Sequence, residues 1–147
     1  MKRSSRNISL LALAGAVAGL FYLMYKNYLF SPNPFAIALQ VAAAALMVWA
    51  RITFGKRSFH AGANPTAGGL VTRGPYRYWR HPIYAAITYF VWAGVLSYHS
   101  VEAHATALAV TLCLAVRMIL EEQLLIAEYP EYTEYARKTK RFIPYIV

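Results

Sequence analysis

Two long apolar runs open the sequence, and a proline pair separates them. Residues 8–29 are ISLLALAGAVAGLFYLMYKNYL, residues 31–34 are SPNP, and residues 35–54 are FAIALQVAAAALMVWARITF. Each run approaches the ~20 residues with which an α-helix crosses ~30 Å of hydrocarbon. Because proline lacks a backbone N–H and disfavours helix at the residue before it, the SPNP segment predicts a tight turn between two antiparallel helices.

A second pair of apolar runs follows at residues 82–98 and 101–120, with His99 and Ser100 as the turn between them. The run at 82–98 is the shortest of the four. We therefore expect an all-α integral membrane fold with about four transmembrane helices. The basic start of the chain also resembles a signal peptide, but the first run is longer than a typical signal-peptide core, and we expect a retained span.

Composition favours the bilayer over a soluble core. Hydrophobic residues make up 59% of the 147 residues and charged residues only 14%, whereas soluble domains are about half apolar and a quarter charged. The net charge of +9 could suggest nucleic acid, but the basic residues lie between apolar runs, and we expect no nucleic-acid partner. The single cysteine, Cys113, excludes an internal disulfide. We expect one membrane-embedded domain over residues 1–147.

The basic residues also predict the orientation in the membrane. Fourteen of the fifteen Lys and Arg residues lie within residues 1–7, 51–81 and 117–147. Lys26 alone falls in an outer turn, so the positive-inside rule places both termini, the loop 55–81 and the segment 121–147 in the cytoplasm. We expect the fourth span to continue into that last segment as a cytoplasmic helix, kinked near Pro130.

Charged residues interrupt the inner end of the fourth run. Arg117 precedes Glu121 by four residues, and Glu122 follows directly. Positions i and i+4 share one helix face, so Arg117 and Glu121 can meet or can both face one pocket. Burying such charges in hydrocarbon costs roughly 2.5–3.5 kcal/mol each, so they predict a polar cavity. The alternative is a snorkelling arginine with interfacial glutamates.

A second cluster, Arg80-His81-Pro82-Ile83-Tyr84, begins the third run. Proline suits the first turn of a helix, and His81 would lie at the N-cap, where backbone N–H groups can hold an anion. A single histidine at a membrane boundary can equally be structural. No HExxH, CxxC, GxGxxG or P-loop pattern accompanies it, so we expect no metal site and no soluble-type nucleotide site.

Three pieces in this order resemble the isoprenylcysteine carboxyl methyltransferase family, which is related to the phospholipid N-methyltransferases. They are residues 70–84, LVTRGPYRYWRHPIY; the Arg117-x-x-x-Glu121-Glu122 element; and the tail from Glu131-Tyr132-x-x-Tyr135 through Arg141-Phe142-Ile143-Pro144. The resemblance covers about residues 68–144, roughly half of the chain. It departs at Ala86, where the family commonly has glycine, and at Tyr129-Pro130, where the family commonly has Phe-Gly.

The resemblance implies S-adenosylmethionine as the methyl donor, held at the cytoplasmic ends of the last spans. The residues carried over as cofactor-binding are Gly69, Leu70, Val71, Tyr76, His81, Pro82, Tyr84 and Glu121. Arg117 is carried over as the residue that positions the methyl acceptor. Glu122 is a second candidate catalytic residue, because an amine acceptor would need a base such as His81 or Glu122.

The implied function is methyl transfer to a lipid-like acceptor from the surrounding membrane lipids, with the carboxylate of an isoprenylcysteine-like substrate favoured. An ionised carboxylate needs no base, only alignment and exclusion of water. The alternatives are a phospholipid amine N-methyltransferase, a sterol-type membrane reductase with a nicotinamide cofactor, and a membrane scaffold without enzymatic activity. The reductase is disfavoured because a dinucleotide should need more basic groups than this short chain offers.

Overall fold

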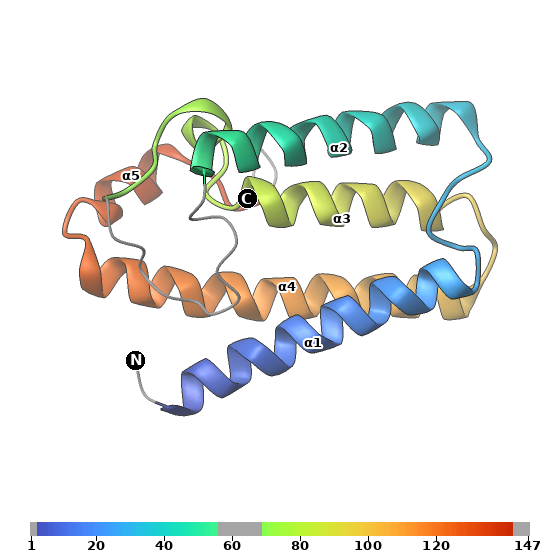
Figure 1. Ribbon diagram of the computed structural model, residues 1–147, viewed down its shortest axis with the longest axis horizontal. Coiled ribbons are helices and arrows are strands. Elements are labelled where there is room, and N and C mark those ends of the chain that lie inside the picture. Colours follow the sequence, from blue (N-terminus) through green and yellow to red (C-terminus); the bar gives the residue numbers. More distant parts are fainter. Residues whose placement is uncertain (1–2, 56–68, 143–147) are drawn as a thin grey trace.

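The structure, a computed structural model, describes residues 3–55 and 69–142 of the chain. Its helices are α1 (Arg3–Tyr25), α2 (Pro34–Phe54), the 3-10 helix η2 (Gly74–Arg77), α3 (Pro82–Val95), α4 (Val101–Glu128) and α5 (Tyr132–Lys138) (Figure 1). The only strand-like pairing in this part of the chain is an isolated parallel bridge between Trp79 and Lys140. Residues 56–68 of the predicted loop and residues 143–147 of the predicted C-terminal segment lie outside the described residues.

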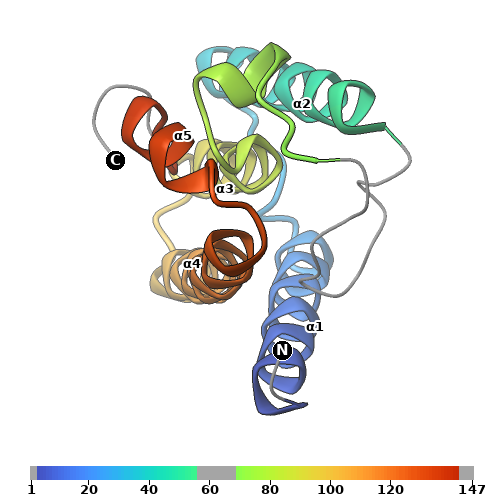
Figure 2. The same cartoon turned by 90° about the vertical axis from the view of Figure 1, so that its left-hand side faces the viewer.

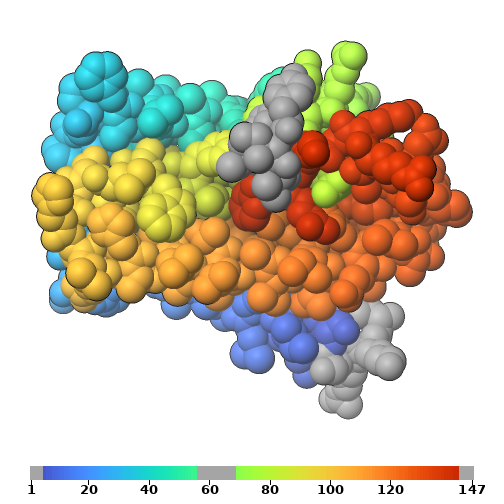
Figure 3. Space-filling view, turned by 180° about the vertical axis from the view of Figure 1, so that it is seen from behind, coloured from blue at the N-terminus to red at the C-terminus, as the bar shows by residue number. Residues whose placement is uncertain are grey.

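The four long helices run alternately up and down. α3 lies between α2 and α4, and α1 packs beside α4 (Figures 1 and 2). As a result, the amino ends of α1 and α3 and the carboxyl ends of α2 and α4 share one end of the bundle. We call this the polar end. α5 and residues 139–142 lie over the polar end beside α4 (Figure 3).

The prediction of an all-α integral membrane fold is confirmed. Three helices are long and apolar enough to cross a membrane, within Ser5–Tyr25, Pro34–Phe54 and Val101–Glu128. Many of their large apolar side chains face outward, among them Leu11, Leu39 and Leu112. The fourth helix, α3, is apolar but has only 14 residues. Outward-facing apolar surface of this extent is what a bilayer covers.

Two helices end earlier than the sequence predicted. α1 stops at Tyr25 because Asn27 adopts a left-handed φ of 58°, and the N–H of Tyr28 turns back to the carbonyl of Leu23 at 2.8 Å. Such a left-handed residue is a common helix terminator. α3 stops at Val95 rather than at residue 98, because the backbone there forms tight turns such as Ser97 N–H to Gly94 O at 3.2 Å.

The predicted kink near Pro130 is instead a break. α4 ends at Glu128, Tyr129 is extended with φ −118° and ψ 105°, and a separate α5 begins at Tyr132. The residue before a proline is pushed away from the helical region, which explains the extended Tyr129. The break lets α5 leave the line of α4 and turn back over the polar end (Figure 1).

Glycines allow α1 to approach α4 closely. A Cβ atom added to Gly19 would lie 2.5 Å from Cγ2 of Val110, and one added to Gly15 would lie 3.0 Å from Sγ of Cys113. Small residues four apart are typical of close helix contacts in membranes. Here Gly15 and Gly19 form a contact between two helices of the same chain. This contact sets the position of α1 relative to α4.

Candidate functional site

The two polar clusters of the sequence meet at the polar end. His81 takes the N-cap position of α3 with φ −125° and ψ 60°, and Pro82 occupies the first turn. Proline fits there because the first N–H groups of a helix have no helical partner. The His81 side chain makes no capping bond. It turns instead toward the last third of α4, where Glu121 and Glu122 lie.

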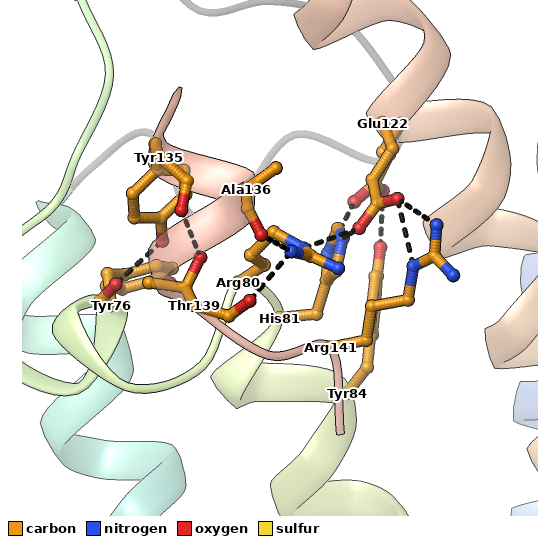
Figure 4. A network of polar contacts seen from close by, with 10 residues as sticks. Tyr76, Arg80, His81, Tyr84, Glu122, Tyr135, Ala136, Thr139 and Arg141 are labelled. Carbon is orange, nitrogen blue, oxygen red and sulfur yellow. Dashed lines mark hydrogen bonds and ion pairs between the residues drawn. The ribbon is translucent and has the colours of Figure 1, made fainter. Parts of the chain in front are cut away.

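Glu122 is the centre of a network of basic groups (Figure 4). Its Oε1 accepts a bond from Nε of Arg80 at 2.9 Å and lies 3.3 Å from Nε2 of His81. Its Oε2 accepts bonds from Nε and Nη2 of Arg141 at 3.0 and 2.7 Å. Glu122 is buried, and bonds of this kind between charged groups are the strong ones. One carboxylate thus joins α4, the start of α3 and residues 132–142, which are α5 and the four residues after it and which we call the C-terminal segment.

Glu121 belongs to a second group with Tyr84 and Arg117. The Tyr84 hydroxyl donates to Oε1 of Glu121, and Nε of Arg117 donates to the Tyr84 oxygen at 3.1 Å. Nη2 of Arg117 lies 3.3 Å from the same carboxylate. The His81 ring stacks on Tyr84 with centroids 5.7 Å apart, and its Nδ1 lies 3.7 Å from Glu121. The His81 ring therefore lies between the two glutamates.

Arg117 also contacts the first helix. Its Nη1 donates to the carbonyl of Ser9 at 2.9 Å and to the Ser9 hydroxyl at 3.1 Å. Both residues are buried, with 3% of Arg117 and none of Ser9 exposed. Sequence reasoning missed Ser9. The available signal was its seven-residue spacing from Ala16, which together with Leu23 forms the buried stripe of α1.

The C-terminal segment is fastened over the site by backbone and side-chain bonds (Figure 4). The N–H of Arg80 donates to the carbonyl of Lys140 at 2.7 Å, and Nη1 of Arg80 donates to the carbonyls of Thr139, at 2.8 Å, and Ala136. The Tyr135 hydroxyl donates to the carbonyl of Tyr76 at 2.7 Å. Arg80 was named in the second cluster of the sequence but was given no role, and Tyr135, Thr139 and Arg141 were not predicted as site residues. The two adjacent glutamates were the available signal, because buried carboxylates need basic partners.

Ionisation in this segment follows from these contacts. The hydrogen bond to Glu122 raises the pKa of the Arg141 guanidinium, so the pair stays charged. Burial raises the pKa of Tyr135 to about 12. Burial likewise raises the pKa of Tyr76 and of Tyr132 above the ordinary tyrosine range. The phenols around the C-terminal segment are therefore neutral hydrogen-bonding groups at physiological pH.

The structure brings together the predicted residues His81, Tyr84, Arg117, Glu121 and Glu122, with Pro82 beneath them in the first turn of α3. Gly69, Leu70 and Val71 lie in the irregular segment that leads to η2. Gly69 adopts a φ of 77°, and no atom lies within 4 Å of where its Cβ would be. Tyr76 is buried in η2. A role in cofactor binding remains a prediction for these four residues, as it does for His81, Pro82, Tyr84 and Glu121.

The part of the chain that the structure describes contains no group of three or more His, Cys, Asp or Glu side chains placed to hold a metal ion. The acidic groups at the polar end are instead held by basic side chains and by tyrosine.

Comparison with known proteins adds a family. A model of the phospholipid methyltransferase family matches residues 27–132. The chain is 36% identical over 83 residues to the cobalt-zinc-cadmium resistance protein CzcN of Cupriavidus metallidurans. This aligned region covers 51% of this chain and 35% of CzcN. Over 76 residues it is 37% identical to the nickel-cobalt-cadmium resistance protein NccN of Alcaligenes xylosoxydans xylosoxydans, covering 51% and 36%.

The chain spans about a third of the length of these curated relatives. No solved structure matches it. The family match, in contrast, covers well over half of the chain and includes α2, α3 and α4 with His81, Tyr84, Arg117 and both glutamates. The chain therefore belongs to the phospholipid methyltransferase family, which implies a membrane methyltransferase with S-adenosylmethionine as its methyl donor.

Proposed function

We propose that the polar end transfers a methyl group from S-adenosylmethionine to a lipophilic acceptor that arrives from the bilayer. The acceptor class we favour is the carboxylate of an isoprenylcysteine-like molecule. The observation that carries this proposal is the joined group of Arg117, Tyr84 and Glu121 beside His81, at the polar end of apolar helices. A soluble donor and a membrane-dissolved acceptor could both reach such a position.

The residues present fit the donor. Glu121 is partly exposed, and its carboxylate could accept bonds from an amino group or from ribose hydroxyls. Tyr132 is buried, with 1% of the residue exposed. Its hydroxyl has no hydrogen-bond partner among the described residues. Buried polar groups are normally hydrogen-bonded, so this hydroxyl supports the presence of a polar ligand nearby. When bound, S-adenosylmethionine supplies the methyl group from its sulfonium sulfur.

Specific residues would hold the donor in this proposal. Glu121, His81 and Tyr84 would bind it directly, with Pro82 and Tyr76 shaping the wall and the backbone at residues 69–71 closing the other side. Glu122 would act indirectly, because its bonds to Arg80 and Arg141 keep the C-terminal segment over the site.

Arg117 would hold the acceptor. A guanidinium recognises carboxylates with its planar set of N–H donors. In the structure its contacts with Ser9, Tyr84 and Glu121 fix the guanidinium before any acceptor arrives. Groups that are fixed in advance align reactants at the least entropic cost, which is the main requirement of an in-line displacement.

The same contacts favour a carboxylate over an amine. A protonated amine must lose a proton before it can attack, and the candidate bases were His81 and Glu122. Glu122 holds three basic groups, and both ring nitrogens of His81 face carboxylates, at 3.7 Å for Nδ1 and 3.3 Å for Nε2. An ionised carboxylate acceptor needs neither residue as a base.

The test is methyl transfer from tritiated S-adenosylmethionine by the purified protein in lipid nanodiscs. N-acetyl-S-farnesylcysteine and phosphatidylethanolamine serve as the two acceptors. We expect label in a product of the first that alkali releases as methanol, which identifies a methyl ester. Label in phosphatidylethanolamine alone would show that the acceptor is an amine and not a carboxylate. Calorimetric binding of a nicotinamide dinucleotide but not of S-adenosylhomocysteine would overturn the proposal in favour of a reductase.

A further inference from the structure

The first helix, α1, lies entirely outside the part of the chain that matches the family. The match begins at residue 27, whereas α1 ends at Tyr25. A helix of this kind could serve only as an extra membrane span. However, one of its side chains reaches the site, because Ser9 contacts the same guanidinium that joins Tyr84 and Glu121.

The contact occurs where α1 and α4 separate. The two helices touch closely at Gly15 and Gly19, and α1 slants away from α4 toward its amino end (Figure 1). The long side chain of Arg117 bridges this widening space to Ser9. Apolar side chains alone could have filled it, and leaving a charged group there is costly unless it is fully bonded.

Ser9 and Tyr84 hold the guanidinium from two helices. Ser9 binds Nη1 through two oxygens, its carbonyl at 2.9 Å and its hydroxyl at 3.1 Å, while Tyr84 binds Nε at 3.1 Å. Bonds to Nη1 and Nε together fix both the position and the plane of a guanidinium. Without the Ser9 hydroxyl, Nη1 would keep its bond to the Ser9 carbonyl but lose its bond to a side chain of α1, and Ser9 would hold the guanidinium less tightly.

We infer that α1 is part of the methyl-transfer site and that Ser9 is a positioning residue that orients Arg117 toward the acceptor. The inference rests on the proposed function, in which Arg117 holds the acceptor. It extends the site beyond the residues of the family match, to a serine of an otherwise apolar stripe.

The test compares Ser9→Ala, Arg117→Lys and the double variant in nanodiscs, with N-acetyl-S-farnesylcysteine as the methyl acceptor. Ser5→Ala, one turn earlier on α1, is the matched control. A hydrogen bond to a charged group is worth about a factor of ten in binding, so we expect Ser9→Ala to raise the KM for the acceptor about tenfold. We expect an unchanged Kd for S-adenosylhomocysteine in Ser9→Ala and wild-type kinetics for Ser5→Ala.

The double variant separates positioning from packing. If Ser9 acts through Arg117, adding Ser9→Ala to Arg117→Lys should raise the acceptor KM little further. If Ser9 only packs against α4, the double variant should show the full effect of Ser9→Ala on top of that of Arg117→Lys. A normal acceptor KM in Ser9→Ala, with a raised KM in Arg117→Lys, would overturn the inference and leave the proposed function standing. A normal acceptor KM in Arg117→Lys would overturn the proposed role of Arg117 and the inference with it.

Discussion

At the scale of single residues, the adjacent glutamates of α4 have different surroundings. Glu122 is buried among Arg80, His81 and Arg141, whereas Glu121 is more exposed and faces Tyr84 and Arg117. Successive residues of a helix point about 100° apart, so one turn of α4 can serve two purposes. We propose that Glu122 holds the C-terminal segment in place and that Glu121 binds the methyl donor.

Replacing Glu122 should therefore damage stability more than chemistry. Glu122→Gln leaves Arg80 and Arg141 without their carboxylate, and breaking a buried ion pair costs about 3–5 kcal/mol. We expect a lower Tm in detergent and faster tryptic cleavage after Arg137 or Lys138. Glu134→Gln, which loses only an exposed pair with Lys138, is the control. A stable Glu122→Gln protein with a protected C-terminal segment would contradict this assignment.

The pKa of Tyr135 gives a prediction about pH. Its folded pKa of about 12 lies above the ordinary value of 10.0, so the neutral phenol contributes stability that is fully present below pH 10. That contribution is lost as pH rises from 10 through 12. We expect cleavage of the C-terminal segment to accelerate over this window. Tyr135→Phe, which cannot ionise, should show a smaller acceleration, and an identical pH profile in both proteins would exclude the contribution.

At the scale of elements, the contact between α1 and α4 depends on small residues. A larger side chain at Gly19 would collide with Val110, and overpacking typically costs about 1–3 kcal/mol. We expect Gly19→Leu to lower the Tm and also to raise the acceptor KM, because α1 would carry Ser9 away from Arg117. Ala18→Leu, at an exposed neighbouring position, should change neither. A normal acceptor KM in Gly19→Leu would contradict a role of α1 in the site.

Element ends and long-range partners explain what sequence could and could not predict. The apolar runs were predictable because the length of a membrane helix must match the thickness of the bilayer. The contact between Arg117 and Glu121 was predictable because positions i and i+4 share one face of a helix. The earlier end of α1 depended on the left-handed Asn27, and the break before α5 on the extended Tyr129. The spacing of Ser9 from Ala16 indicates a buried position, but the partners of Ser9 and Arg141 could not be found from spacing, because they lie 108 and 19 residues away.

At the scale of the whole molecule, the fold gathers the amino end of α1, the carboxyl end of α4 and the C-terminal segment at one end (Figure 1). We propose that this polar end faces the cytoplasm, where fourteen of the fifteen Lys and Arg residues would also lie. In that orientation the donor site opens to the compartment that supplies soluble cofactors.

Cysteine labelling in intact cells tests this orientation. In a Cys113→Ala background, a cysteine is placed by His99→Cys in the exposed turn before α4, or by Arg137→Cys in α5. A membrane-impermeant maleimide should label the first protein from outside and the second only after the cells are opened. The reverse pattern would place the polar end on the outer face.

The most direct test of the account is calorimetric titration of S-adenosylhomocysteine into Glu121→Ala and Arg117→Ala, alongside assays of methyl transfer. We predict that Glu121→Ala loses measurable binding, whereas Arg117→Ala binds with a near-normal Kd and loses methyl transfer. Normal binding by Glu121→Ala would contradict the account, because the group of Glu121, Tyr84 and His81 would then not be the donor site.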